Sequence, residues 1–172
     1  MYVDDLDIPV GKVSDTVRRI IDRAIDESRR REHALLTSEH LFLAFAQVKW
    51  TLFAEAMGDV ELNPYTILQA IEQHLRALPP GGGGEPRVTP TIKLVCKLAL
   101  HHASRTGRLV IDAADLFIAM LQETSGVPVS IVRQHGVDPE VLVSKVNVRA
   151  RDLEISQDEL LRRVSGRGGL LR

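Results

Sequence analysis

Apolar residues recur along the chain at intervals of three and four, the spacing that places them on one face of an α-helix. Two long stretches follow this pattern. Charged residues separate the members of the first, Val17, Ile20, Ile21, Ala24 and Ile25. The second follows Thr89-Pro90, an N-cap with proline at the first helical position, and comprises Ile92, Val95, Cys96, Ala99 and Ala103. The pattern predicts two amphipathic helices, each with one buried face.

Two shorter stretches, "LLTSEHLFLAFAQ" (35–47) and "VIDAADLFIAMLQ" (110–122), predict helices with a wider apolar face. Each places an N-cap residue, Thr37 or Asp112, shortly before an apolar run. We expect the first of these to be the most buried helix. Third helices are predicted over residues 50–57 and 128–136, where Gly58 and Gly136 suit a helix end. Fourth helices are predicted from the cap-proline pairs at residues 63–64 and 138–139.

These elements form a tandem duplication, because Val13 aligns with Val88 at an offset of 75 positions (88 minus 13) without a gap through Gln47 and Gln122. We predict an all-α fold of two pseudo-symmetric four-helix repeats packed into one domain. Its predicted parts are an N-terminal extension (1–12), repeat 1 (13–78), a mobile Pro/Gly linker (79–87), repeat 2 (88–150), and a short C-terminal helix with a flexible tail (151–172).

The composition narrows the functional class. The 172 residues are 44% hydrophobic and 26% charged, with a formal net charge of −1, so no global attraction to nucleic acid or anionic membranes is expected. The lone Cys96 fits a reducing compartment, and neither a signal peptide nor a membrane-length apolar run is visible. A cytoplasmic protein is the expectation, without nucleic-acid or membrane partners.

The duplicated unit resembles the amino-terminal domain of Clp-family AAA+ chaperones and unfoldases over roughly residues 13–148. The family pattern T-x-E-H followed by a hydrophobic run is matched by Thr37, Glu39, His40 and residues 41–46. "SRTGRLVIDAADLFIAML" in the second repeat looks more like the ClpA than the ClpC type. The resemblance implies a double-repeat, protein-binding fold.

In such proteins this domain docks unfolded or tagged clients, or adaptors such as ClpS and MecA. In a longer chain it would serve an AAA+ ring and a ClpP-like peptidase. The sequence has no G-x-x-x-x-G-K-[ST] motif, so we expect no cofactor here and ATP only in a downstream ring. A free-standing regulator made of this domain alone is an alternative. A helical nucleic-acid-binding protein is the alternative from another class, although acids dilute its arginine runs.

The resemblance also names candidate binding residues. In ClpC-type relatives an acid at the Glu39 position and a threonine at the start of the first helix help bind phosphorylated arginine. The matching positions here are Glu39 and Ser14, whereas the second repeat has Thr89 but Ala114 in place of the acid. The candidates for substrate or adaptor binding are therefore Ser14, Glu39, His40 and Thr89. Alternatively, Thr37 and Glu39 only stabilise a helix N-terminus, by about 0.3–1 kcal/mol for the charge.

A second candidate is an apolar groove between the repeats, lined by Trp50, Phe53, Val127 and Val129. The alternative is that these side chains fill the core between the repeats. No HExxH, CxxC or G-x-S-x-G pattern occurs, so we expect neither a metal site nor catalytic residues. Cys96 lies on an apolar stripe and is expected to pack rather than react.

Overall fold

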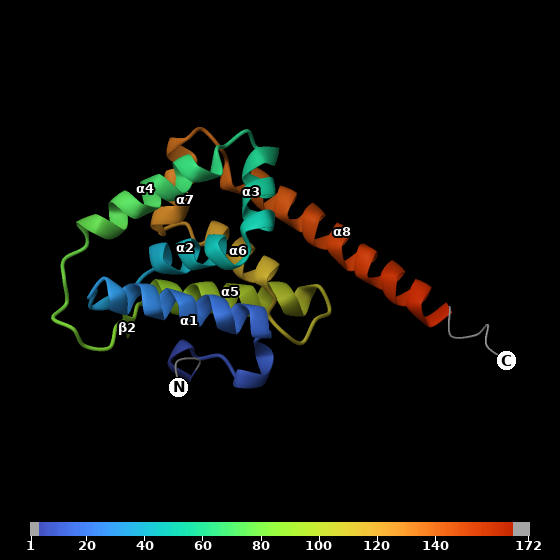
Figure 1. Cartoon of the computed structure of the whole chain (residues 1–172), viewed down its shortest axis with the longest axis horizontal. Coiled ribbons are helices and arrows are strands. Elements are labelled where there is room, and N and C mark those ends of the chain that lie inside the picture. The colour runs from blue at the N-terminus through green and yellow to red at the C-terminus, as the bar shows by residue number, and fades with distance from the viewer. Residues whose placement is uncertain (1–3, 167–172) are drawn as a thin grey trace.

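The computed structural model describes residues 4–166 and confirms an all-α architecture (Figure 1). Repeat 1 contains α1 (Asp15–Arg30), α2 (Ser38–Val48), α3 (Trp50–Asp59) and α4 (Pro64–Ala77). Repeat 2 contains α5 (Pro90–Arg105), α6 (Ala113–Gln122), α7 (Val127–Gln134) and α8 (Pro139–Gly166). Two 3-10 turns, η1 (Asp4–Leu6) and η2 (Val10–Lys12), precede α1. The expected pair of four-helix repeats is therefore present.

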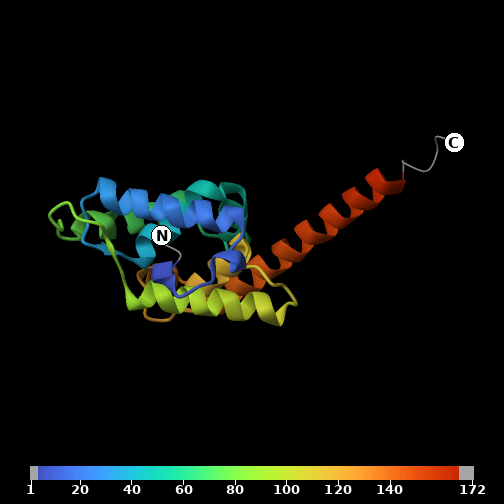
Figure 2. The same cartoon turned by 90° about the horizontal axis from the view of Figure 1, so that it is seen from below.

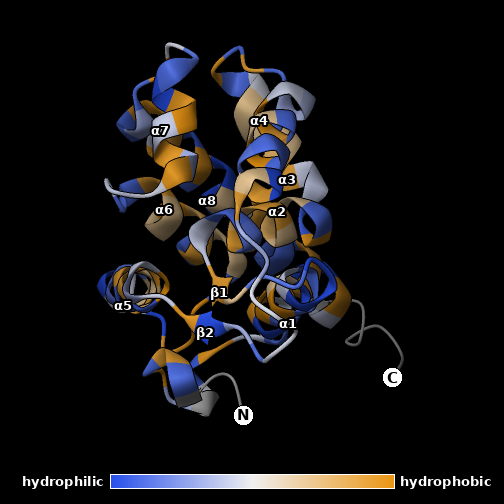
Figure 3. Cartoon of the chain, turned by 90° about the vertical axis from the view of Figure 1, so that its left-hand side faces the viewer, coloured by the Kyte–Doolittle hydropathy of each residue, from blue (hydrophilic) through white to orange (hydrophobic). Residues whose placement is uncertain are grey.

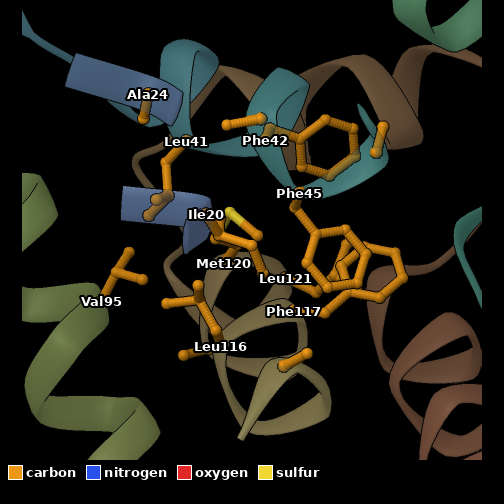
Figure 4. Close-up of a cluster of buried hydrophobic side chains, with 14 of the residues drawn as sticks. Ile20, Ala24, Leu41, Phe42, Phe45, Val95, Leu116, Phe117, Met120 and Leu121 are labelled. Atoms are coloured by element: carbon orange, nitrogen blue, oxygen red, sulfur yellow. The ribbon is translucent and has the colours of Figure 1, made fainter. Parts of the chain in front are cut away.

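The two second helices, α2 and α6, form the centre of the core. Every residue of α2 from Ser38 to Ala46 is buried, as the wide apolar face predicted. Phe42 of α2 and Phe117 of α6 stand at equivalent positions, and their ring centroids lie 6.0 Å apart. The Phe45 ring lies closer to Phe117, at 4.4 Å. Figure 4 shows these rings beside aliphatic side chains from α1 and α5, so one continuous core joins both repeats.

The repeats exchange contacts at their edges. Strand β1 (Leu35–Leu36), just before α2, pairs in parallel with β2 (Arg87–Val88), just before α5 (Figure 3). The equivalent pairing joins Val13, before α1, to Ile111, before α6. The same crossing occurs in the helices, since α3 of repeat 1 packs against α8 and α7 of repeat 2 packs against α4. Each repeat is thus completed by elements of the other.

The Pro/Gly linker is anchored near its start. Pro80 forms an antiparallel bridge with His33, and the backbone N–H of Gly81 donates to the carbonyl of Glu32 at 2.5 Å. A Cβ atom on Gly81 would collide with the backbone of Ala34, so only glycine permits this close approach. At its far end, Arg87 belongs to β2.

The end of the chain differs from the prediction. We expected a short separate helix after residue 150, but residues 139–166 form the single continuous helix α8. Ser156 to Glu159 match the Ser-x-x-Glu capping-box pattern, which predicts a helix start, but in the structure they continue α8. The second half of α8 projects away from the other helices (Figures 1 and 2). The flexible tail was predicted from Ser165, but α8 continues to Gly166, and the rest of that tail lies outside the described residues.

Candidate functional site

His40 lies in the first turn of α2, and its side chain is completely buried. Its Nδ1 accepts a hydrogen bond from the backbone N–H of Thr37 at 3.1 Å, and its Nε2 lies 2.8 Å from Nδ1 of His33. A ring nitrogen that accepts an N–H bond carries no proton, so the network assigns the proton of neutral His40 to Nε2. His40 therefore donates to His33, and the two neutral imidazoles close the N-terminus of α2.

The environment of this pair favours the neutral form. Burial lowers the pKa of His40 to about 4, and the neighbouring His33 and Arg31 lower it in the same direction. Burial also lowers the pKa of His33 below its usual value. Because His40 has no exposed surface, it cannot contact a protein ligand in this conformation. The structure therefore places His40 in the cap of α2 and not on the surface, and its part in docking stays a prediction.

Glu39 is also largely covered, with 6% of its surface exposed. Its Oε2 accepts a hydrogen bond from Ser38 Oγ at 3.3 Å. A second acid, Glu123 at the end of α6, is buried to a similar degree. Its Oε1 accepts a hydrogen bond from Ser125, and its Oε2 has no hydrogen-bond partner among the described residues. The position of Glu39 in the first turn of α2 fits a charge that complements the helix dipole. Little of its carboxylate is open to a ligand.

Ser14 and Thr89 are the N-caps of the equivalent helices α1 and α5. Ser14 Oγ accepts from the Val17 N–H at 3.2 Å and lies 3.3 Å from Oδ1 of Asp112 in the opposite repeat. Thr89 Oγ1 donates to the carbonyl of Leu36 at 3.0 Å, also across the repeats. Ser14 therefore bonds to the start of α6, whereas Thr89 bonds beside the start of α2. The four candidate residues do not form one site in repeat 1.

The predicted apolar groove is not formed by its four candidate residues. Phe53 and Val129 are fully buried and belong to the core, in agreement with the alternative interpretation. Val127 is half-buried. Trp50 is 36% exposed and lies against Tyr65 of α4, with ring centroids 5.0 Å apart. Of the four residues, only Trp50 thus contributes substantial exposed surface, and it does so together with Tyr65.

A network of ion pairs covers the outer side of repeat 1. Arg31 bridges α1 and α4, since it lies 2.6 Å from both Glu27 and Glu72. Arg30 also pairs with Glu27 at 2.6 Å, and Arg76 pairs with Glu72 at 3.3 Å. Burial acts to raise the pKa of Glu27, but hydrogen bonds and charges from Arg30 and Arg31 outweigh it and lower that pKa. Arg30 and Arg31 therefore both pair with carboxylates of the same repeat.

Repeat 2 has a different cluster at the start of α6. Asp115, equivalent to His40, is completely buried and accepts the backbone N–H of Asp112 at 2.8 Å. Arg108, equivalent to His33, approaches both Asp115 oxygens at 2.5 and 2.6 Å, and His102 Nδ1 lies 2.6 Å from Oδ1. The aspartate thus performs the capping task of His40, but as a buried charge with cationic and imidazole partners.

Other reactive groups are enclosed. Burial raises the pKa of the Cys96 thiol to about 12, so it packs as an apolar side chain. Among residues 4–166, no group of three or more His, Cys, Asp or Glu side chains is arranged to hold a metal ion. None of the helices in the same range combines the length and apolar character that a membrane crossing requires.

Residues 12–135 match the model of the Clp repeat (R) N-terminal domain family. The chain belongs to this family. A curated relative of the Clp N-domain is the chaperone protein ClpB of Chlamydia pneumoniae, which is 26% identical over 110 residues. That match covers 63% of this chain but only 13% of ClpB, so the chain corresponds to a small part of the relative.

Solved structures share the Clp N-domain fold. The Hsp104 N-terminal domain from Candida albicans aligns with a TM-score of 0.70 at 14% identity, covering 78% of this chain and 89% of that one. A ClpV N-domain in complex with a VipB peptide aligns with a TM-score of 0.61 at 13% identity, covering 84% and 93%. At 13–14% sequence identity, the similarity to these two structures shows a shared fold.

The partners of the two buried capping residues were not predicted from the sequence; they are His33, Arg108 and His102. A signal was available in the duplication. His33 and His40 align with Arg108 and Asp115, so a pair of imidazoles in one repeat becomes an ion pair in the other. Such paired exchange at a fixed spacing of seven residues indicates contact. The bridge from Arg31 to Glu72 had no comparable signal, because its partners lie 41 positions apart.

Proposed function

We propose that this Clp N-domain is a protein-recognition module that docks substrates or adaptors for a Clp-type ATP-dependent unfoldase. The observation that carries the proposal is the family match over residues 12–135. The peptide complex of a ClpV N-domain with the same fold supports it, since that protein binds a peptide of VipB. The proposal extends to cytoplasmic partners: unfolded or tagged clients, a ClpS- or MecA-like adaptor, and a ClpP-like peptidase beside an AAA+ ring.

The surface supports recognition rather than catalysis. Trp50 and Tyr65, which we call the aromatic pair, present exposed rings from α3 and α4. Aromatic residues are enriched at protein interfaces, where their large apolar area combines with a polar group. The reactive side chains considered above are buried or bonded within the domain. We propose the aromatic pair as one contact region for an apolar segment of a client.

Fluorescence anisotropy with the full chain tests the proposal. The probes are fluorescein-labelled lysozyme that has been reduced and blocked with iodoacetamide, a labelled ClpS-like adaptor, and a labelled DNA duplex. We expect binding to the unfolded protein or to the adaptor, and none to DNA at physiological salt. Trp50→Ala should weaken binding, whereas Leu161→Ala on the projecting part of α8 should not. DNA binding without protein binding would overturn the proposal.

A further inference from the structure

The ion-pair network of repeat 1 has an incomplete counterpart in repeat 2. At the offset of 75, the two acids of the network are replaced, Glu27 by His102 and Glu72 by Asn147. Two of its arginines are kept, since Arg30 corresponds to Arg105 and Arg76 to Arg151. Repeat 2 therefore lacks both carboxylates at this position but has two of the guanidinium groups.

These residues of repeat 2 meet around one pocket. A cavity of about 260 Å³ lies between the C-terminal half of α5, the end of α6 and the middle of α8. Its lining includes Arg105, Arg151, His101, His102 and Asn147 but no carboxylate. In repeat 1 the corresponding space is crossed by internal bonds, such as the 2.7 Å bond from Arg23 to Gln47, whose counterparts are Leu98 and Gln122.

Neither Asp115 nor Asp152 lines the pocket. Asp115 bonds to His102, but it is completely buried and also holds Arg108. Asp152, the neighbour of Arg151 in sequence, lines a separate cavity. Among the side chains that the structure describes, no acid forms an ion pair with Arg105 or Arg151. The pocket thus has two guanidinium groups, and no carboxylate among its lining residues balances their charge.

We propose that this pocket, lined by Arg105 and Arg151, binds the carboxylate side chains of an acidic peptide segment. The planar guanidinium fork matches a carboxylate with two parallel hydrogen bonds. Incoming carboxylates take the place that Glu27 and Glu72 fill in repeat 1, and Asn147 offers an additional amide donor. The proposal rests on the proposed function in protein recognition and identifies the chemistry of one class of ligand.

The first experiment compares two labelled peptides of equal length that differ only in four consecutive residues, all glutamate or all glutamine. We expect the full chain to bind the glutamate peptide at least roughly tenfold more tightly at low salt, with the difference shrinking as salt screens the charges. Arg105→Gln and Arg151→Gln should each weaken it roughly threefold to tenfold. The matched control is Arg76→Gln, the equivalent arginine of repeat 1, which should leave the affinity unchanged.

A second variant restores the missing acid. Asn147→Glu introduces the residue found at Glu72, where Glu72 pairs with Arg76 at 3.3 Å. We expect this variant to lose the preference for the glutamate peptide, with no decrease in the urea midpoint of unfolding. A lost peptide preference with an unchanged urea midpoint would show that the variant neutralises the charge of the pocket without destabilising the fold.

Several outcomes would overturn the inference. They are equal affinity for the two peptides, an Arg105→Gln Arg151→Gln double variant that binds normally, or inorganic phosphate that binds more tightly than the glutamate peptide. The unfolded lysozyme probe separates this inference from the proposed function. The domain can bind exposed apolar segments of unfolded lysozyme without using the pocket for acidic peptides. Binding to lysozyme without discrimination between the peptides rejects the pocket alone. Absence of binding to lysozyme, to the adaptor and to both peptides rejects both proposals.

Discussion

The first turn of α2 and the first turn of α6 occupy equivalent positions in the two repeats. The N-terminus of α2 is capped by a histidine, whereas that of α6 is capped by an aspartate. Both side chains are fully buried, and both accept the backbone N–H of the N-cap residue. His40 does so as a neutral ring bonded to His33, whereas Asp115 does so next to Arg108 and His102. The same helix geometry thus tolerates either chemistry, provided that the partners change with it.

The largest difference in stability between the two helix N-termini should appear when the buried hydrogen-bond acceptor, Asp115 or His40, is replaced. Asp115→Leu leaves Arg108 beside a buried apolar side chain and should lower the free energy of unfolding by about 3–5 kcal/mol. His40→Leu removes hydrogen bonds between neutral groups and should lower it by about 1–3 kcal/mol. Urea unfolding at pH 7 measures both values. Equal losses would mean that the buried charge does not distinguish the two helix ends.

Acid should act on the histidine pair first. In the folded chain the pKa of His40 is about 4, below the ordinary value of 6.5. The unfolded chain therefore binds more protons between these pH values, so stability is complete above pH 6.5 and is lost as the pH falls towards 4. We expect a loss of about 2–3 kcal/mol between pH 6.5 and 4.5, measured by urea unfolding at several pH values.

A capping variant separates this effect from other titrations. His40→Gln keeps an acceptor for the Thr37 N–H in an ordinary capping box but cannot titrate. It should flatten the pH dependence above pH 4.5, while the control His101→Gln, at an exposed histidine, should not. The pKa values of Glu27 and Glu72 lie below the ordinary 4.5, so the stability that they contribute is lost only at lower pH. An unchanged slope in His40→Gln would assign the acid loss to other groups.

Replacing Glu27 in repeat 1 and the equivalent His102 in repeat 2 should change the free energy of unfolding by smaller amounts. Glu27→Gln removes the charge that pairs with Arg30 and Arg31 and should cost about 2 kcal/mol, because Glu27 is buried. His102→Gln at the equivalent position should cost about 1 kcal/mol, since Arg108 continues to neutralise Asp115. Thermal and urea unfolding of both variants give the comparison. A larger loss for His102→Gln would show that the imidazole is the main partner of Asp115.

The smallest effects concern the two N-caps that bond across the repeats. Ser14→Ala and Thr89→Ala should each cost about 1 kcal/mol, the usual value for a lost helix cap. Thr89→Ala should cost more than Ser14→Ala, because the Thr89 hydroxyl donates at 3.0 Å to the partly buried Leu36 carbonyl, whereas the Ser14 hydroxyl donates at 3.3 Å to an exposed Asp112 carboxylate. Thr16→Ala, within the first turn of α1, serves as the comparison at a position that is not a cap. Identical losses for the two cap variants would indicate that the bond to Leu36 adds no stability.

Much of the fold could be predicted because its signals are local. The helices were predicted from the apolar spacing, from the caps at Thr37 and Asp112, and from the cap-proline pairs. The offset of 75 showed which helices of the two repeats correspond. The candidate site was harder, since exposure depends on tertiary packing. Glu39 and His40 look polar in sequence, yet α2 is enclosed on all sides from Ser38 to Ala46. The strand pairing between Leu36 and Val88 also escaped prediction, because two-residue strands carry no periodic pattern.

The crossed pairing of β1 with β2, and of Val13 with Ile111, gives the contact between the repeats the form of an isologous interface within one chain. Each half donates an edge and receives one, as identical subunits do in a two-fold dimer. Residues 79–87 then act as a tether that keeps the halves at high effective concentration. Cutting this tether should leave two fragments that restore the native helix content only when they are mixed.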